Sequence, residues 1–546
     1  MLQNVGTIIV PTFCEVSCIV ASEVKSKSGK YTYLYESVSY RNDEGLPRNR
    51  RKIIGKVDHK TGEKIYKPEY VQRMQAQGVV LISADTAALY SAQDIMNSSV
   101  KEFGLIFLLR TLANRCGLIE AIDVASPRFG KQIFAIASHL VACGDPFMYC
   151  QEWLMETDNL DDAGDLSSQR ISEILSELTI GERESFYRQW CKRRSELEYL
   201  ALDITSVSSY SELIDDVEWG HNRDNESLPQ INLCMLMGET SRLPIYQTVY
   251  SGSLKDVSTL KTTMAKFDAV TDGKPVLAVM DKGFCSKKNI DALLSEKKKF
   301  VMAVSFSLAF AKNQVKSECK DIDCLNNTIV LGGDSLRAVT KKRAWNVEHS
   351  VFSHVFYNPV KATNDREKLY AKVAEMRKNA TIEPQKYVDD PYYKKFLNIR
   401  KSAKSGYTVT VRDDAVEDAY KHAGWLVIVS NQIASAEEAL RIYRAKDVVE
   451  KGFQRLKNSL DLGRLRVHGD MAMQNKVFIG FIALILISQI HNTMLDAQLY
   501  KKYTLKQLLG VLAKHRIQEI NGKRIQFTPT KQQREIYSAF GIKFDL

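Results

Sequence analysis

The sequence predicts an α/β protein whose central α/β domain is interrupted by a β-rich insertion and preceded by a β-rich segment and a helical domain. Residues 196–305 alternate between apolar, strand-like runs and helical stretches, whereas residues 306–422 are polar and heterogeneous. One more strand and a long helix follow in residues 423–500. We therefore expect one domain from 196–305 and 423–500 around the insertion 306–422, with a β-rich basic segment at 1–95, a helical domain at 96–195 and a basic tail at 501–546.

The first 95 residues read as strands and turns. Tyrosines alternate along the strand-like run from Tyr31 to Val38, and Gly45-Leu46-Pro47 is typical of a turn. A basic cluster follows that turn and consists of Arg48, Arg50, Arg51 and Lys52. The cluster is consistent either with a solvated hairpin or with a patch that tracks phosphates.

Residues 96–195 carry helical periodicity. The apolar side chains of one stretch recur on a single helical face: Phe103, Ile106, Phe107, Leu109 and Leu112. Ser167 and Ser168 precede another amphipathic stretch, so they predict the N-terminal cap of a helix. This helical domain is a candidate for DNA binding, although no segment in it is identifiable as a recognition helix.

The strands and helices of the central domain follow a definite order. Strands are expected at 199–207, 230–237, 244–249, 275–280 and 300–305, with helices at 257–268 and 287–295. The order β-β-β-α-β-α-β is that of a ribonuclease-H-like domain.

The second half of the chain adds four expectations. The insertion contains short strands, such as 350–357, and a charged helix around 366–377. A strand is expected at 425–430, and Ser435 with Glu438 forms the pattern of a capping box that opens one long helix reaching Leu460. The tail reads as helical and basic.

The composition of the chain favours some classes of protein and excludes others. Lys and Arg total 76 against 65 Asp and Glu in 546 residues, a net charge of +11 that favours a polyanionic partner. Ten cysteines are too few for a disulfide framework. No export signal is visible, and the most apolar run, from Val477 to Ile487, is shorter than the ~20 residues of a membrane span. We expect a cytoplasmic protein without a membrane span, in which this run is a buried core helix.

Three acidic residues are candidates for a catalytic site. Asp203 interrupts an apolar strand, where a carboxylate is costly unless it is paired or bound to a metal. Asp281 ends another apolar strand, and Gly283 permits a sharp turn after it. Acids at the ends of neighbouring strands would converge. Taken singly, a structural salt bridge explains Asp203 equally well.

Glu450 lies on the long helix expected after residue 435. The apolar stripe on that helix, which would dock on the sheet, is Val449, Phe453, Leu456 and Leu460. Gly452 weakens a helix, which suggests close packing at that point. Taken alone, Glu450 also fits an ordinary glutamate that faces solvent.

The three acids together suit phosphodiester chemistry. Two divalent ions about 3.5–4 Å apart activate a water and stabilise the leaving oxygen, and Mg²⁺ prefers carboxylate ligands. Asp203, Asp281 and Glu450 are the expected metal ligands, and Lys457 and Arg455 could neutralise phosphates of a bound strand.

Tyr443, Lys446, Glu450 and Lys457 follow the spacing Tyr-x2-Arg-x3-Glu-x6-Lys. In this the sequence resembles bacterial insertion-sequence transposases of the DDE type, whose β-rich insertion precedes the catalytic Glu. Segments 202–206 and 279–284 resemble the two Asp blocks of that family, and 220–224, 228–230, Gly252 with Asp256, 424–425 and 430–431 also agree. Lys446 replaces the signature Arg, with Arg444 two residues away, and Asp447 stands where relatives often have Trp.

The resemblance implies a DNA transposase that uses Mg²⁺ or Mn²⁺. Water would release a 3′-OH at the transposon end, and that hydroxyl would attack target DNA. Tyr443, Lys446 and Lys457, with Arg444 and Arg455 close by, would contact the DNA. The implied partners are double-stranded DNA, as terminal inverted repeats and target, and a second copy in a homodimeric synaptic complex that associates with the nucleoid when acting.

Two alternatives stay open at the level of sequence. The first is a non-enzymatic DNA-binding protein derived from a transposase, and the second is a different ribonuclease-H-like nuclease that acts on hybrids or junctions.

Overall fold

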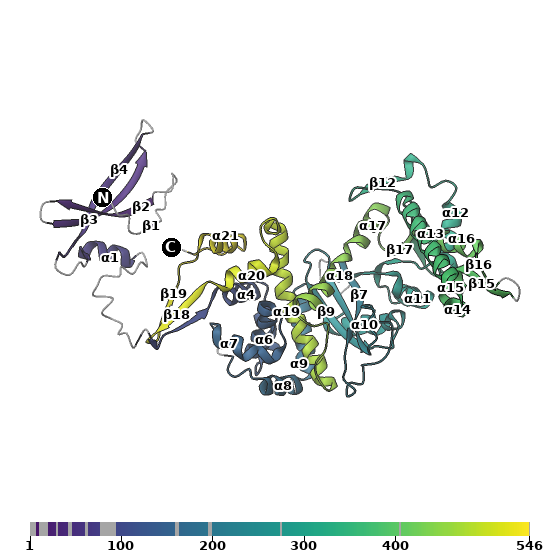
Figure 1. Ribbon diagram of the computed structural model, residues 1–546, viewed down its shortest axis with the longest axis horizontal. Helices are drawn as coiled ribbons and strands as arrows, with labels where there is room; N and C mark the ends of the chain where they lie inside the picture. Colours follow the sequence, from purple (N-terminus) through teal and green to yellow (C-terminus); the bar gives the residue numbers. More distant parts are fainter. Residues whose placement is uncertain are drawn as a thin grey trace. The chain divides into compact units, whose positions relative to one another are not determined.

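The computed structural model describes residues 7–9, 20–28, 31–41, 46–59, 64–76, 94, 96–158, 163–194, 199–273, 276–402 and 406–544 (Figure 1). The predicted turn at Gly45 begins outside the described residues. The chain divides into two compact units. The first consists of Met1–Leu108, Glu152–Leu160 and Thr493–Leu546, and the second of Leu109–Gln151 and Asp161–Asn492.

The first unit contains an antiparallel sheet formed by the N-terminal residues. Its strands lie in the order β1 (Thr7–Ile9), β2 (Val20–Ser28), β3 (Tyr31–Arg41), β4 (Pro47–Val57) and β5 (Lys64–Tyr66), and helix α1 (Pro68–Ala76) follows. Leu34, Ile54 and Tyr70 form the buried centre of this sheet and helix. The strand-like run that begins at Tyr31 is therefore confirmed as a strand.

The remainder of the first unit is built around the C-terminal tail. Strand β6 (Ser99–Glu102) pairs with β18 (Arg516–Ile520), which forms a hairpin with β19 (Lys523–Gln526). Helices α20 (Leu505–Ala513) and α21 (Lys531–Ala539) flank the hairpin in sequence. The prediction of a helical tail is therefore confirmed for α20 and α21 and wrong for the hairpin, where Ile517 and Ile520 are buried on a strand.

Helices dominate residues 104–192, as predicted. They are α4 (Gly104–Arg115), α5 (Leu118–Ala125), α6 (Gly130–Cys143), α7 (Cys150–Glu156), α8 (Ser168–Glu177) and α9 (Ile180–Lys192). The Ser167 side chain accepts a hydrogen bond from the backbone N–H of Arg170, which confirms the predicted cap of α8. Thr179 and Glu182 form a reciprocal capping box at the start of α9.

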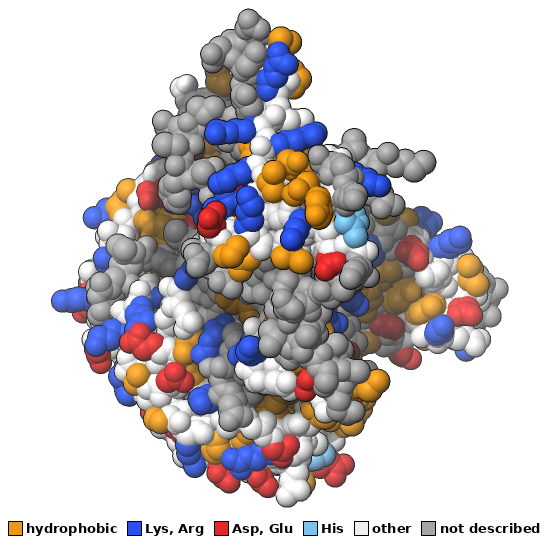
Figure 2. All heavy atoms as spheres, turned by 90° about the vertical axis from the view of Figure 1, so that its left-hand side faces the viewer, with side chains coloured by type: hydrophobic (Ala, Val, Ile, Leu, Met, Phe, Trp, Pro, Cys, Tyr) orange, Lys and Arg blue, Asp and Glu red, His pale blue; other side chains and the backbone are white. Residues whose placement is uncertain are grey.

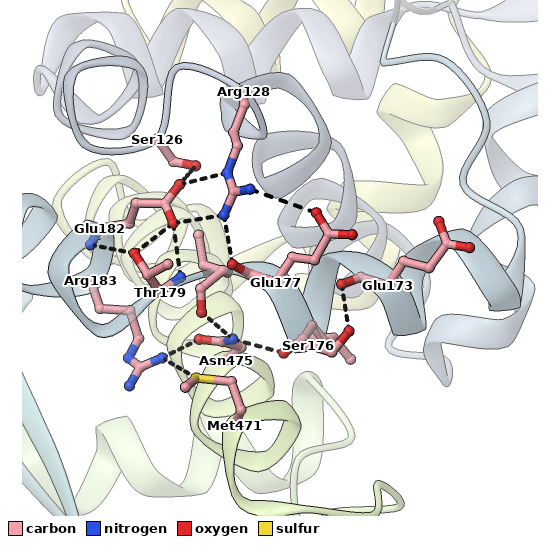
Figure 3. A network of polar contacts seen from close by, with 12 residues as sticks. Ser126, Arg128, Glu173, Ser176, Glu177, Thr179, Glu182, Arg183, Met471 and Asn475 are labelled. Atoms are coloured by element: carbon pink, nitrogen blue, oxygen red, sulfur yellow. Dashed lines mark hydrogen bonds and ion pairs between the residues drawn. The ribbon is translucent and has the colours of Figure 1, made fainter.

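The junction between α8 and α9 is fixed to the long helix α19 (Asp470–Asp496). The Asn475 side chain donates hydrogen bonds to the backbone carbonyls of Leu175 and Leu178, both at 2.7 Å, and accepts one from Arg183 (Figure 3). By length and composition α19 could cross a membrane, but 78% of its apolar window is buried inside the protein. The prediction of a buried core helix at 477–487 is therefore confirmed.

A nine-stranded mixed sheet forms the centre of the second unit, which confirms the α/β prediction. Its strand order is β12-β13-β14-β17-β11-β10-β7-β8-β9. All six strands expected in the two parts of the domain lie in it: β7 (Tyr199–Ser208), β8 (Gln230–Gly238), β9 (Pro244–Ser251), β10 (Leu277–Met280), β11 (Lys299–Ala303) and β17 (Trp425–Ser430). Strand β10 is parallel to both β7 and β11, whereas the other neighbours are antiparallel. Helices α10 (Asp256–Thr271) and α11 (Lys287–Ser295) connect β9 to β10 and β10 to β11.

The insertion is mixed rather than β-rich, which corrects the prediction. Strands β12 (Thr328–Leu331), β13 (Asp334–Ala344) and β14 (Ser350–Tyr357) extend the large sheet through β17. The rest is mainly helical: α12 (Ala309–Glu318), α13 (Pro359–Ile382), α14 (Pro384–Tyr387), α15 (Pro391–Phe396) and α16 (Asp413–Tyr420), with a hairpin of β15 (Leu397–Ser402) and β16 (Gly406–Val411). The helical part has a small apolar core of its own, around Val373, Met376 and Phe396. The charged helix seen in the sequence extends over 24 residues as α13, capped by Asn358 with Pro359 at its start.

The helix expected from Ser435 to Leu460 is broken into three pieces. Helix α17 (Ala436–Ala445) ends and α18 (Asp447–Gln454) begins at Lys446, and a π-helical turn (Arg455–Ser459) follows. Ser435 caps α17 by accepting from the backbone N–H of Glu438, which confirms one of the two hydrogen bonds of the predicted capping box. Breaks of this kind are frequent at functional sites and leave no clear trace in periodicity.

Candidate active site

Asp203 lies in the middle of strand β7, with buried residues on both sides of it. The backbone N–H of Ile204 donates to its Oδ1 at 2.8 Å. Burial raises the pKa of Asp203 to about 6, although Lys446 and Arg223 act in the opposite direction. The negative charge of Asp281 raises this pKa further, so the two carboxylates lie close enough to repel each other.

Asp281 directly follows strand β10. The parallel register pairs Met280 with Leu202, which places Asp281 beside Asp203 on neighbouring strands, as predicted. Gly283 follows in a short 3-10 turn, but its φ is not in the left-handed region. A Cβ at Gly283 would come within 3.1 Å of Asp256 Oδ2, so the glycine favours a close approach to Asp256 rather than an unusual turn.

Glu450 is carried by α18, which packs on β7 and β8. The predicted apolar stripe is confirmed, since Val449, Phe453, Leu456 and Leu460 are all buried. A Cβ on Gly452 would collide with the side chain of Met237 on β8, which confirms that this glycine marks close packing. The Glu450 side chain itself is half exposed, at 50%.

Tyr443 and Lys446 lie among the three acids. The Tyr443 hydroxyl donates to Asp281 Oδ1 at 2.7 Å, and Lys446 Nζ donates to Glu450 Oε1 at 2.8 Å. Burial lowers the pKa of Lys446, but the hydrogen bond to Glu450 and the charges of all three acids outweigh burial and raise it. Burial, and then the same acids, raise the pKa of Tyr443. The structure therefore gathers five predicted residues, Asp203, Asp281, Glu450, Tyr443 and Lys446, at one place.

A cleft of about 1020 Å³ opens beside these side chains. Asp281, Lys446 and Glu450 line it together with the aromatic rings of Phe306 and Trp425. Carboxylates, an ammonium group and aromatic faces in one cleft can accept a phosphodiester and a planar base.

Comparison with known proteins identifies the family. Residues 194–486, more than half of the chain, match the family model described as "Transposase DDE domain". The chain belongs to this family of DDE transposases. The match spans the large sheet, the insertion and α17–α18, so all three candidate acids of the transposase lie within it.

Two other comparisons add no argument about this transposase. No curated protein matches its sequence. A cryo-EM structure of a piggyBac transposase synaptic complex with hairpin DNA aligns with 73% of this chain and 69% of that chain, at 10% identity and a TM-score of 0.35.

DDE transposases generally use divalent metal ions, and the three acids suit one chemically because carboxylate oxygens are the ligands that Mg²⁺ prefers. Within the described part of the chain, no three His, Cys, Asp or Glu side chains lie close enough together to hold a metal ion as they stand. Tyr443 engages Asp281 and Lys446 engages Glu450 instead.

The other predicted DNA-binding residues do not contact the three acids by any recorded interaction, although Arg444 lines the same cleft as Asp281 and Glu450. Lys457 Nζ contacts Asp224 Oδ2 at 2.6 Å, on the loop before β8. Arg444 points to the insertion, where it donates to the carbonyl of Leu331 at 3.0 Å and pairs with Asp334 at 2.9 Å. Arg455 is buried, with 9% of its surface exposed.

A further pair of residues in the transposase had no role assigned from the sequence. Arg223 Nη2 donates to both carboxylate oxygens of Asp256, at 2.6 and 2.5 Å. The charge of Arg223 lowers the pKa of Asp203, and Asp256 also lies against Gly283 in the turn after Asp281. The pair therefore affects the charge of Asp203 and contacts the turn that follows Asp281. The segments that contain it agree with the family pattern, which was the available signal, but spacing alone does not predict the contact.

Proposed function

We propose that this transposase belongs to a bacterial insertion sequence with the Tyr-Arg-Glu-Lys signature, and that it cuts transposon ends and joins them to target DNA. The observation that carries the proposal is the meeting of Asp203, Asp281 and Glu450 around Lys446 and Tyr443. The strand order β9-β8-β7-β10-β11, with β10 parallel to both β7 and β11, supports a ribonuclease-H-like core.

Two transfers account for the reaction. In the first, a water oxygen attacks the phosphorus at the transposon end and the P–O3′ bond breaks, which leaves a 3′-OH. In the second, that 3′ oxygen attacks a target phosphorus and displaces a target 3′ oxygen. One phosphodiester bond forms for each one broken in this second step, so no nucleotide cofactor is needed.

The three carboxylates would bind the metal ions, and the basic residues around them would contact the DNA. Asp203, Asp281 and Glu450 would hold Mg²⁺ or Mn²⁺, which supplies activation of the attacking oxygen and charge for the leaving oxygen. Lys446 and Tyr443 would release the acids and turn to the phosphate of the scissile strand, while Lys457 would follow the neighbouring phosphate. Arg444 would hold the insertion in place through Asp334.

Paired ends and a cytoplasmic location complete the proposal. Two copies would hold two terminal inverted repeats in one synaptic complex, because joining both ends to one target requires two sites. The net charge of +11 suits work on DNA at the nucleoid.

The test is a cleavage and strand-transfer assay with the chain, Mg²⁺ and duplexes copied from the ends of the element. Asp281→Asn and Glu450→Gln are expected to lower both 3′-OH release and joining by more than about 100-fold while DNA binding is retained. Asp447→Asn is the matched control, because Asp447 lies on the same helix but pairs with Lys451 at 2.6 Å. Equal activity in Glu450→Gln would disprove the assignment, and hydrolysis without any joined product would identify a nuclease instead.

A further inference from the structure

Strand β4 carries positive side chains on both of its faces. Its pairing with β3 places Arg50 opposite Val38 and Lys52 opposite Glu36, so Arg48, Arg50 and Lys52 share one face. Arg51 lies opposite Ser37 and Lys56 opposite Tyr33, on the other face. All five cations are exposed. Figure 2 shows Lys and Arg side chains gathered on this part of the molecule.

These cations have little acid to neutralise them. Among the described side chains of β2 to β5, Glu36 is the acidic one, and it already pairs with Arg73 of α1 at 2.6 Å. Helix α1 packs through Tyr70 on Leu34 and Ile54, so it covers one end of one face. The opposite face presents Tyr31, which is 55% exposed.

Strand β5 covers only one end of the outer edge of β4. Among the described strands, residues 47–53 pair with β3 alone, because β5 joins β4 only at Gly55, Lys56 and Val57. Charged side chains on an edge strand can simply prevent edge-to-edge aggregation. That role does not require five exposed cations on two faces, beside which Glu36 is the one acid among the described side chains of these strands.

Cations on both faces indicate a partner that has negative charge on two sides. A flat anionic surface, such as a membrane, would meet one face only. A DNA groove has a phosphate backbone on each side, and the major groove, about 12 Å wide, is wide enough for a strand ribbon, whereas the minor groove is about 6 Å wide.

We infer that the β3–β4 ribbon enters the major groove of duplex DNA by the edge of β4 at residues 47–53. Arg48, Arg50 and Lys52 then contact the phosphates of one strand, and Arg51 and Lys56 contact those of the other. The inference rests on the proposed function for its partner, duplex DNA, and adds an anchoring surface in the first unit that contains none of the catalytic acids.

The experiment measures binding without cutting. Full-length chain carrying Glu450→Gln is titrated, without divalent metal, into a labelled duplex of about 40 base pairs copied from the DNA beside the gene. Arg48→Ala with Arg50→Ala and Lys52→Ala removes one face, and Arg51→Ala with Lys56→Ala removes the other. The slope of log affinity against log salt is expected to fall by roughly 2.7 and 1.8, at about 0.9 per lost phosphate contact. Affinity near 0.15 M salt is expected to fall at least about 10-fold in each case.

Three controls make the result decisive. Arg48→Lys with Arg50→Lys keeps the charge and is expected to retain most of the affinity, which excludes misfolding as the cause of a loss. Replacement of Lys312, Lys316 and Lys320 by Ala removes three exposed charges of the insertion, and an equal loss there would overturn the inference. Methylation of guanine N7 in the duplex, which blocks the major groove, is expected to weaken binding by the parent chain.

Other outcomes point elsewhere. If only one set of alanine substitutions lowers DNA affinity, the DNA lies flat on that face. If the variants aggregate but keep their DNA affinity, the charges serve to protect the strand edge from aggregation. Either result overturns the inference. If the wild-type chain binds DNA through the ribbon but never cuts it, the proposed function is overturned, whereas DNA binding by the ribbon is still supported.

Discussion

Asp203→Asn is expected to make the metal-free protein more stable while it abolishes cutting. Burial raises the pKa of the Asp203 carboxyl from 3.8 to about 6. The folded state therefore holds a proton that the unfolded state has lost between about pH 4 and 6, and wild-type stability falls as pH rises through that window. At 1.36 kcal/mol per pKa unit, the full shift corresponds to about 3 kcal/mol above pH 6.

Asparagine carries no charge and keeps an oxygen that can accept the hydrogen bond from the backbone N–H of Ile204. The variant should therefore exceed wild type by up to about 3 kcal/mol in free energy of unfolding at pH 7.5, by roughly half as much at pH 5, and by almost nothing below pH 4. Urea unfolding followed by tryptophan fluorescence at each pH measures the difference.

Added Mg²⁺ provides the second half of the test. A metal that binds only the folded state stabilises wild type, and the variant should lose most of that gain along with its cleavage activity. Asp447→Asn serves as the control, because Asp447 is exposed and pairs with Lys451. A gain in Asp203→Asn that is absent at pH 7.5, or that does not change with pH, would refute the reasoning from burial.

Three further predictions concern side chains around the site. Lys446→Met should lower the metal-free free energy of unfolding by up to about 1 kcal/mol, because half-exposed Glu450 loses its partner, and thermal melting should show a smaller deficit in saturating Mg²⁺. Gly452→Ala should destabilise the protein and slow cleavage despite the better helix propensity of Ala, because the new methyl collides with Met237; a melting temperature above wild type would contradict this packing. Glu182→Gln should cost about 2–3 kcal/mol at pH 7: burial opposes ionisation of Glu182, but hydrogen bonds from Arg128, Thr179 and Ser126 hold its pKa at about 2, so the deficit in urea unfolding should shrink as pH falls from 4.5 toward 2.

The sequence predicted the elements of the site better than the contacts between them. Asp203 and Asp281 stand out because a charged residue in or after an apolar strand is costly and therefore visible in the pattern. The stripe from Val449 to Leu460 is equally visible, since periodicity reports which face of a helix is buried. Both signals are local, and the residues that produce them lie within a few positions of each other.

Contacts between distant segments are a different matter. Tyr443 and Asp281 are 162 residues apart, and nothing in either local sequence shows that one hydroxyl will meet one carboxylate oxygen. The extension of the sheet by β12–β14 depends on pairing between β14 and β17, which the polar composition of the insertion does not reveal. Arg455 is buried at the start of the π-helical turn, and neither its burial nor the turn can be predicted from helical periodicity.

The break at Lys446 explains how three acids can share one site. Because α18 starts at Asp447, Glu450 lies in the first turn of a helix, where the helix dipole favours negative charge. An unbroken helix from Ser435 would have placed Glu450 far from either helix end, so the helix dipole would no longer favour its negative charge. The same break leaves Lys446 at the junction, where its ammonium faces all three carboxylates in the absence of a metal. Removal of the Lys446 ammonium should by itself strengthen metal binding, because it frees Glu450 and removes a positive charge from the site. A straighter helix, favoured by Lys446→Ala, should cancel part of this gain, because the charge of Glu450 would lose its helix terminus. Calorimetric titration of Mg²⁺ into Lys446→Ala and Lys446→Met tests this, since both remove the charge but Ala has the higher helix propensity; equal affinities in the two variants would mean that the break plays no part.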